Sequence, residues 1–474
     1  MFGFKDPTHT IAVMDEATSL VEARAQEHQR ALASLDLKDE ARGLVAEQLK
    51  PDVSGISTQD LEAGAPEVRG KVEYIASTVI EKLQQRGLAG KGPIISDDQA
   101  AVLLQHVLDW QFGAGPLEPL FHEADVEDIV VNSSDSGLEV WTYRQSGKRR
   151  ESIEISFDAL REIINRNAGV QGRALNPLSP ILNAQMRNGA RINAVLNPVC
   201  DPHIAVTIRI HRLVARKFDD LVRLGTLSPA AAAWLWLCVQ GGLSIIVGGG
   251  TSSGKTNLLN AIASVMPANL RCVVIEDTRE LELPVPDKVY LTTVQPADGS
   301  RPITQRQLIA NAMRMRPDHI ILGEVRDAAA WDAVKACNTG HEGTLLSIHA
   351  DDANGVLIRL SQLSGEASET ANIPERMLRE VIAAAFQCVV YLERRRQPDG
   401  SYRRFVTQIT EVNGLVADGV TVQKPIFTFS GGALVWTKQW PHERILRCLF
   451  EHGFTNRDVE QALTGNTRFW EMPA

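Results

Sequence analysis

The feature that most constrains this chain is a glycine-rich loop set between an apolar run and a helix-like pattern. The stretch reads IIVGGGTSSGKTNLLNAI over residues 245–262. Its residues 249–256 match G-x-x-x-x-G-K-[ST], a pattern in which backbone N–H groups and the positive end of a helix converge on phosphate oxygens. The apolar run before the loop and the helical pattern after it give the context that this motif requires. The sequence therefore predicts a bound nucleoside triphosphate rather than a glycine-rich turn without function.

Each part of the loop has a predicted task. The Lys255 ammonium is expected to reach the β and γ phosphates, and the Thr256 hydroxyl is expected to bind Mg²⁺. ATP and Mg²⁺ are therefore the predicted cofactors. The residues predicted to bind the nucleotide are Gly249, Gly250, Thr251, Ser252, Ser253, Gly254, Lys255, Thr256 and Asn257.

Three downstream segments place polar side chains where predicted strands end. VVIEDTRELELP carries Glu276 and Glu280, HIILGE ends in Glu324, and TLLSIH ends in His349. Ligands of open α/β sheets bind at the carboxyl edge of the strands, and carboxylates gathered near a triphosphate serve Mg²⁺ or a water molecule. A solvated acidic loop is the alternative for the first segment, and a satisfied polar group is the alternative for His349.

Composition and local patterns narrow the class of protein. The formal net charge of −9 argues against a protein that coats nucleic acid. The six cysteines form no CxxC pair, which favours buried reduced thiols over disulfides or a metal site. The first twenty residues lack an apolar core with a cleavage site, so no secretory signal is expected. The uncharged stretch from Trp234 to Gly250 imitates a membrane span, but Gly241 and Gly242 interrupt it, so a helix followed by a strand is predicted.

The length of 474 residues predicts two or three domains. From Gly115 onward, VEDIVVNS, LEVWTY, RINAVL and HIAVTIRI are predicted strands of a first α/β unit, with FDALREIINRNA as a helix. A second unit alternates the strands LSIIV, RCVVI, HIIL and TLLSI with helices, which predicts a mostly parallel sheet covered on both faces. The predicted division is a helical N-terminal extension and linker (1–100), an N-terminal α/β domain (101–212), an interdomain linker (213–226), an ATPase domain (227–430) and a short helical C-terminal tail (431–474). Within the extension, Asp15–Leu49 is predicted as the first helix and the Gly/Ser/Pro-rich stretch Lys50–Glu67 as a linker.

The order of these motifs resembles that of the type II/type IV secretion ATPases. Those enzymes carry a Walker A loop, an Asp box, a Walker B strand ending in Gly-Glu and a His box, and this chain has all four in that order. Upstream, GAGPLEPLFHEADVEDIVVN, NGARINAVLNP and AVTIRI resemble the N-terminal domain of the branch that serves tight-adherence (Flp) pili and conjugation-like secretion. The loop reads GGTSSGKT where many relatives read GGTGTGKT, so Ser252 and Ser253 depart from the family pattern.

The resemblance implies a RecA-like P-loop motor domain with a smaller N-terminal α/β domain and a helical N-terminal extension. It implies a homohexamer in the cytoplasm, at the inner face of the cytoplasmic membrane, which hydrolyses ATP to power pilus assembly or protein secretion. Inner-membrane platform proteins are the implied partners, and they supply the membrane contact. By resemblance, the catalytic residues are Glu280 as general base, Glu324 as Walker B carboxylate and Mg²⁺ ligand, His349 of the His box, and Arg191 and Arg209 from the N-terminal domain.

The sequence leaves two alternative functions open. RecA-like rings also move nucleic acid, and a conjugation-type motor of this class is the main alternative. The acidic net charge and the lack of a basic stretch interleaved with aromatic residues count against nucleic acid as a partner. A scaffold that binds nucleotide without hydrolysis is the third possibility, and the presence of Lys255, Thr256, Glu280 and Glu324 argues against it.

Overall fold

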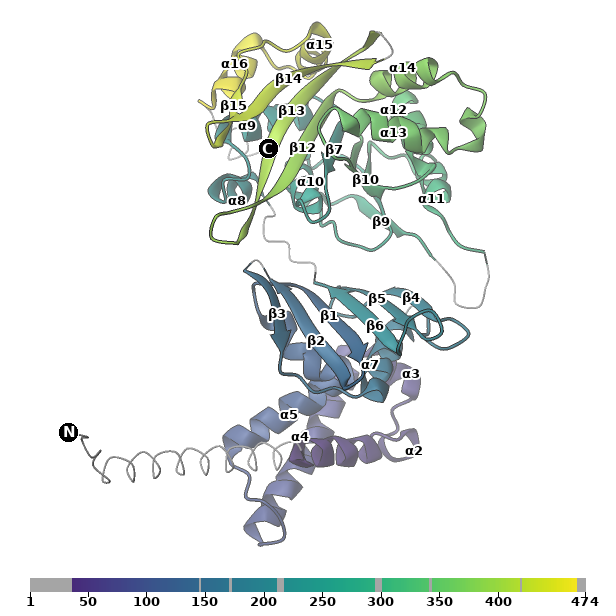
Figure 1. Ribbon diagram of the computed structural model, residues 1–474, viewed down its shortest axis with the longest axis vertical. Helices are drawn as coiled ribbons and strands as arrows, with labels where there is room; N and C mark the ends of the chain where they lie inside the picture. The colour runs from purple at the N-terminus through teal and green to yellow at the C-terminus, as the bar shows by residue number, and fades with distance from the viewer. Residues whose placement is uncertain are drawn as a thin grey trace, which may run out of the picture. The chain divides into compact units, whose positions relative to one another are not determined.

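The computed structural model describes residues 36–144, 146–169, 173–210, 217–294, 301–340, 343–417 and 420–466. The chain forms two compact units (Figure 1). The N-terminal unit holds most of the chain up to Thr207, and the C-terminal unit holds the residues from Ile208 onward together with Thr142–Arg149 and Gly189–Arg191. The predicted interdomain linker falls partly outside the described residues, at 213–216, as do residues 15–35 of the predicted first helix and the end of the tail, 467–474.

The N-terminal unit begins with helices that share an apolar core. The stretch Lys50–Glu67, predicted as a linker, instead contains two short helices. Its glycines explain the difference, because Gly55 and Gly64 adopt left-handed conformations that end these helices, and Ser57 caps the second one. Residues 36–48 are also helical. The remaining bounds are α2 (Pro51–Ser54), α3 (Thr58–Ala63), α4 (Pro66–Leu88) and α5 (Asp97–Phe112).

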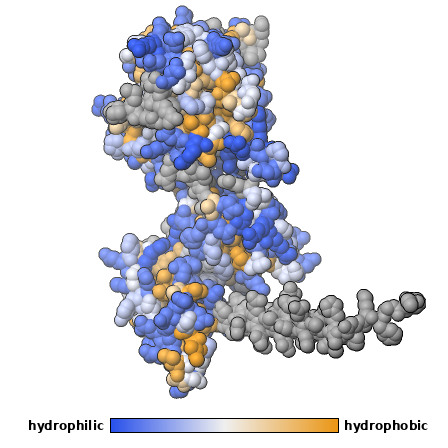
Figure 2. Space-filling model, turned by 90° about the vertical axis from the view of Figure 1, so that its left-hand side faces the viewer, coloured by the Kyte–Doolittle hydropathy of each residue, from blue (hydrophilic) through white to orange (hydrophobic). Residues whose placement is uncertain are grey.

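Apolar side chains stay exposed on these helices. Leu88 and Ile94, at and after the end of α4, are 78% and 76% exposed, and Val102 on α5 is 56% exposed. Figure 2 shows the corresponding apolar surface on the helical part of the N-terminal unit. Among the described residues, no helix is long and apolar enough to cross a membrane.

A six-stranded sheet follows, in the order β3-β2-β1-β6-β5-β4. All four strands predicted for this unit are present, whereas β3 and β4 were not predicted. The helix α7 buries Leu160, Ile163, Ile164 and Ala168, which confirms the predicted apolar face. The bounds are η1 (Gly115–Leu117), α6 (Glu118–His122), β1 (Val126–Ser134), β2 (Gly137–Arg144), β3 (Gly147–Glu151), α7 (Phe157–Gly169), β4 (Ile181–Gln185), β5 (Arg191–Leu196) and β6 (Ile204–Arg209).

The C-terminal unit is built on a nine-stranded sheet in the order β15-β14-β13-β12-β7-β11-β10-β8-β9. The strands from β12 to β9 in this order pair in parallel, and β12 to β15 pair antiparallel. The strand before the glycine-rich loop, β7, therefore lies between β11 and β12. The bounds are β7 (Ile245–Gly249), β8 (Cys272–Glu276), β9 (Lys288–Thr292), β10 (His319–Val325), β11 (Leu345–His349), β12 (Cys388–Arg396), β13 (Tyr402–Ala417), β14 (Val420–Ser430) and β15 (Ala433–Trp436).

Helices cover both faces of this sheet, because alternate residues of each parallel strand point to opposite sides. Ile245 and Val247 pack into one core with α8, α9, α10, α15 and α16. Ile246 packs into the other core with α11, α12, α13 and α14. Figure 1 shows α12, α13 and α14 together on one side of the sheet. The bounds are α8 (Phe218–Arg223), α9 (Pro229–Gln240), α10 (Lys255–Ala263), α11 (Gln305–Ala312), α12 (Ala329–Asn338), α13 (Gly355–Gly365), η2 (Ser368–Thr370), α14 (Glu375–Ala385), α15 (Glu443–Glu451) and α16 (Asn456–Thr464).

This arrangement confirms the predicted fold class, an α/β protein with a RecA-like P-loop unit, a smaller N-terminal α/β unit and N-terminal helices. The stretch that imitates a membrane span is the buried helix α9 followed by the buried strand β7, as predicted. All six cysteines are free thiols. Four of them are buried as predicted, while Cys200 and Cys448 are only partly buried.

Candidate nucleotide-binding site

The glycine-rich loop joins the buried end of β7 to the first turn of α10. Close packing requires glycine at the end of β7: a Cβ on Gly248 would collide with Val356, and one on Gly249 would lie 2.7 Å from the Leu392 carbonyl oxygen. Gly254 has a φ of 99° at the N-cap of α10, a conformation that glycine adopts without strain. The loop therefore presents the N-terminus of α10 as an anion site.

Lys255 lies at the centre of the site and is 7% exposed. Its Nζ donates hydrogen bonds to the carbonyl oxygens of Gly249 and Gly250, both at 3.0 Å. Burial lowers the pKa of Lys255 to about 8, against the opposing charge of Glu324. The ammonium is thus held by backbone carbonyl groups at a position beside the loop.

The structure brings the Asp box to the start of α10. The Thr256 hydroxyl lies 3.3 Å from the carboxylate Oε2 of Glu280. Asn260, one turn further along α10, fixes the same loop, because its amide contacts the Glu280 carbonyl oxygen at 3.5 Å and accepts from the Glu282 N–H at 2.8 Å. The predicted Mg²⁺ ligand and the predicted general base are therefore neighbours. Asn260 was not predicted, since an asparagine inside a helix carries no local signal for a contact so distant in sequence.

The buried side chain of Glu276 holds the backbone of the Asp box through hydrogen bonds. Glu276 ends β8, and its Oε1 accepts the backbone N–H groups of Glu280 and Leu281 at 3.0 and 3.1 Å. Burial raises the pKa of Glu276 to about 7, although these N–H groups oppose the shift. A Cβ on Gly323 would lie 2.8 Å from Glu276 Cγ, which explains glycine before the Walker B glutamate. Glu276 thus packs between the two acidic motifs.

Glu324 stands at the end of β10 with both carboxylate oxygens engaged. Its Oε1 lies 2.7 Å from His349 Nε2, and its Oε2 accepts from Arg326 Nε at 2.5 Å. Arg326 also forms an ion pair with Asp277, at 3.3 Å. Burial alone would raise the pKa of Glu324, but the His349 hydrogen bond and the Arg326 charge outweigh it and hold the pKa at about 2. Glu324 is therefore a carboxylate at neutral pH.

His349 connects the Walker A and Walker B residues. Its Nδ1 lies 3.3 Å from Lys255 Nζ. Because an ammonium can only donate, Nδ1 is the acceptor in this pair, and the ring proton resides on Nε2, which donates to Glu324. His349 thus links the Lys255 ammonium to the Glu324 carboxylate.

The remaining predicted residues belong to the loop, to the first turn of α10 and to two strands of the six-stranded sheet. Thr251 is exposed, Asn257 on α10 is half-buried, and Ser253 is buried. Arg191 begins β5 and Arg209 ends β6, which are neighbouring strands of the N-terminal sheet. Their approach to a nucleotide stays a prediction.

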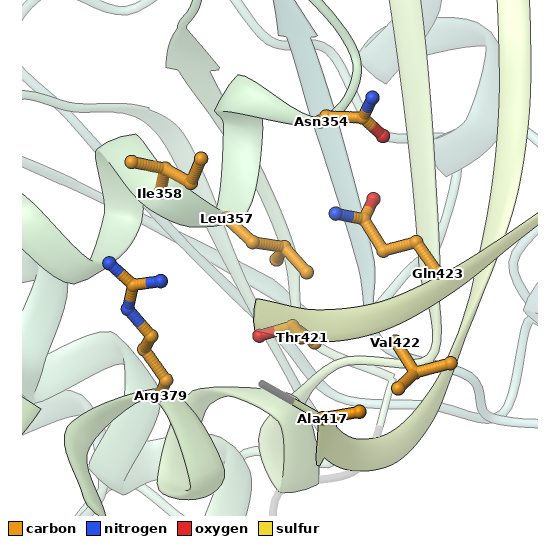
Figure 3. Close-up of a pocket in the computed structure, with 8 residues that line it drawn as sticks. All are labelled: Asn354, Leu357, Ile358, Arg379, Ala417, Thr421, Val422 and Gln423. Atoms are coloured by element: carbon orange, nitrogen blue, oxygen red, sulfur yellow. The ribbon is translucent and has the colours of Figure 1, made fainter. Parts of the chain in front are cut away.

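A cavity of about 400 Å³ lies elsewhere in the C-terminal unit (Figure 3). It is lined by α13, α14 and the β13–β14 pair, and it holds no residue of the loop or the acidic motifs. In Figure 3 the amides of Asn354 and Gln423 approach each other across it, and Arg379 lies on the far side of Leu357. The cavity is therefore separate from the nucleotide site. Its lining residues are Asn354, Leu357, Ile358, Arg379, Ala417, Thr421, Val422 and Gln423.

The comparisons with known proteins agree with the motifs. A family model described as type II/IV secretion system protein matches residues 111–408. A putative conjugal transfer protein of Mycobacterium tuberculosis is 34% identical over 292 residues, which are 60% of this chain and 81% of that protein. The type IV secretion system protein PtlH of Bordetella pertussis is 32% identical over 315 residues, which are 61% of this chain and 91% of that protein.

Two solved structures are also similar. The VirB11 ATPase of the Brucella suis type IV secretion system is 26% identical, with a TM-score of 0.34, over 66% of this chain and 96% of that one. The ATPase DotB of Legionella pneumophila is 17% identical, with a TM-score of 0.44, over 62% of this chain and 78% of that one.

Proposed function

This chain belongs to the type II/IV secretion system protein family, and from that premise we propose that it is an ATPase that powers pilus assembly or protein secretion. The active assembly is a homohexamer in the cytoplasm, at the inner face of the cytoplasmic membrane. It acts on inner-membrane platform proteins of a pilus or secretion system, through which it contacts the membrane.

One observation carries this proposal: the four motifs converge at the carboxyl edge of one sheet. Lys255 contacts His349, His349 contacts Glu324, and Thr256 contacts Glu280. A site that only held nucleotide would need the loop, whereas hydrolysis also needs a positioned base and charged groups that stabilise the phosphates in the transition state. The arrangement of these side chains supports hydrolysis over simple binding.

The donors present fit Mg-ATP. A threonine hydroxyl and carboxylate oxygens are the hard oxygen ligands that Mg²⁺ prefers, and Thr256 and Glu324 would hold the ion. When bound, Mg²⁺ neutralises phosphate charge. Lys255 would bind the β and γ phosphates, and Glu280 would accept a proton from the attacking water molecule. His349 would keep Glu324 oriented through its Nε2 proton.

Arg191 and Arg209 complete the proposed site. Each guanidinium can donate two parallel hydrogen bonds to phosphate and stays charged at any working pH. We assign both arginines to the nucleotide on the family resemblance. In this assignment the N-terminal α/β domain takes part in catalysis, and its movement couples hydrolysis to work.

The similarity to a putative conjugal transfer protein favours a second candidate, a motor for conjugal transfer that moves nucleic acid. The net charge of −9 counts against direct binding of a polyanion. Binding of single-stranded DNA by the purified chain, with an affinity that falls steeply as salt rises, would support this candidate.

The test of the proposed function is turnover of Mg-ATP by the purified full chain. Lys255→Ala should abolish turnover, because the phosphates lose their main side-chain counter-charge. The matched control is Lys82→Ala, at an exposed position on α4, which should hydrolyse ATP like the wild type. Wild-type turnover by Lys255→Ala would reject the site, and no turnover by the wild-type protein would favour a scaffold.

The proposed homohexamer is tested separately, by measuring the molar mass of the purified chain with light scattering.

A further inference from the structure

The antiparallel strands β12 and β13 run beside the glycine-rich loop and lie outside the four sequence motifs. Leu392 on β12 pairs with Gly249 at the end of β7, so the hairpin is fixed to the strand that carries the loop. On β13, Arg404 Nε donates a hydrogen bond to the Ser252 carbonyl oxygen at 2.9 Å. The Arg404 Cδ also lies 3.2 Å from where a Cβ on Gly254 would be. Arg404 of β13 therefore contacts the glycine-rich loop at Ser252 and packs beside Gly254.

The residue that Arg404 contacts is conformationally strained. Ser252 has a φ of 57°, one of three non-glycine residues with positive φ in the described part of the chain. This left-handed conformation is roughly five- to thirtyfold less populated than the ordinary ones for a residue with a Cβ, because the side chain crowds the backbone. A loop with serine at this position therefore needs an additional contact to keep its shape.

We propose that Arg404 is a positioning residue that holds Ser252 in the left-handed conformation, and so keeps the glycine-rich loop in the form that binds nucleotide. The proposal rests on the nucleotide-binding role of the loop and adds a residue that lies 152 positions away in sequence. A hydrogen bond to the carbonyl oxygen fixes the orientation of the peptide that follows Ser252. The hydrogen bond thereby compensates for the absence of glycine.

Direct contact between Arg404 and the nucleotide is the competing explanation. The two explanations differ in what a glycine at position 252 does. If Arg404 acts through the backbone conformation, glycine makes it dispensable, because glycine adopts positive φ without strain. If Arg404 binds the nucleotide directly, its loss is equally harmful with serine or glycine at that position.

The experiment is a double-mutant cycle with four full-length proteins: wild type, Arg404→Met, Ser252→Gly and the double variant. Methionine keeps an unbranched side chain beside Gly254 but lacks the N–H group that donates to the Ser252 carbonyl oxygen. With Mg-ADP as the probe, Arg404→Met should weaken binding by about tenfold in the serine background, and by no more than about twofold in the glycine background. Arg395→Met is the control, because Arg395 pairs with Glu393 instead of the loop, and it should bind like the wild type.

Amide hydrogen exchange separates this proposal from the proposed function, because it needs no nucleotide. Exchange of the amides in residues 250–254 should rise in Arg404→Met and return towards the wild-type rate in the double variant. Equal losses of Mg-ADP affinity in both backgrounds, or unchanged loop exchange in Arg404→Met, would overturn the proposal. Failure of the wild type to bind Mg-ADP would instead refute the nucleotide-binding role.

Discussion

Replacing Glu276 by glutamine should stabilise the protein, by an amount that grows as pH rises above 4.5 and is complete above about pH 7. Glu276 is 4% exposed, and burial raises its pKa from 4.5 to about 7. Glutamine is neutral and nearly isosteric. It keeps an Oε1 that can accept from the N–H groups of Glu280 and Leu281, and it gives up only the longer contact of Oε2 with the Leu281 N–H, at 3.4 Å.

The size and sign of the effect follow from the two pKa values. Below pH 4.5 the carboxyl group is protonated in the folded and the unfolded chain, and the wild type loses no stability. As pH rises from 4.5 to 7, the unfolded chain ionises first and the folded state becomes relatively less stable. Above pH 7 the full difference applies, which at about 1.4 kcal/mol per pH unit is about 3 kcal/mol as an upper bound. Glutamine should recover this free energy.

Thermal unfolding of the nucleotide-free protein measures the effect. Each kcal/mol moves the Tm of a domain of this size by about 2–4 °C, so Glu276→Gln should raise Tm by up to roughly 10 °C at pH 8 and by little at pH 4.5. Glu282→Gln, at an exposed position in the same loop, is the control and should leave Tm unchanged at both pH values. A Tm gain that is equal at both pH values, or a lower Tm at pH 8, would refute the reasoning.

Two further predictions concern catalysis. Glu280→Gln should leave nucleotide binding nearly intact while turnover falls by roughly 10² or more, because the base is lost. Glu324→Gln should also change the Mg²⁺ dependence of turnover, and equal Mg²⁺ dependence in the two variants would show that the roles are assigned wrongly. Arg191→Ala and Arg209→Ala should each lower turnover by on the order of 10² or more, with a smaller effect on nucleotide binding and an unchanged circular dichroism spectrum. Full activity in both arginine variants would remove the N-terminal domain from catalysis.

The sequence predicts the parts of the fold whose signals are local. The loop, β7 and α10 are recognisable together because glycine, lysine and two apolar periodicities occur within one short stretch. The strand β3 escaped prediction because GKRRE offers no apolar residues in alternation. The stretch Lys50–Glu67 is predicted as a linker because it is rich in glycine, serine and proline, whereas Gly55 and Gly64 end helices.

Hydrogen bonds between residues far apart in sequence are the part of the candidate site that the sequence does not predict. The motifs give the residue types at the sheet edge, since each follows a predicted strand. They do not give the hydrogen bonds of Asn260 or Arg404, because each of these joins segments whose separation in sequence has no fixed pattern. The departure at Ser252 illustrates the point. The sequence has serine where the family pattern has glycine. Only the φ angle shows that Ser252 adopts a left-handed conformation, which a contact from another strand would stabilise.

The charges around Lys255 explain how such a site selects a polyanion. Burial lowers the pKa of this ammonium to about 8, so without nucleotide the charged form is costly to keep. The Glu324 carboxylate offsets only part of this cost, because its two oxygens are already engaged by His349 and Arg326. A triphosphate supplies the missing negative charge at the loop and restores a favourable environment for the cation. The free energy of burying Lys255 is thus recovered on binding, and a neutral ligand cannot recover it.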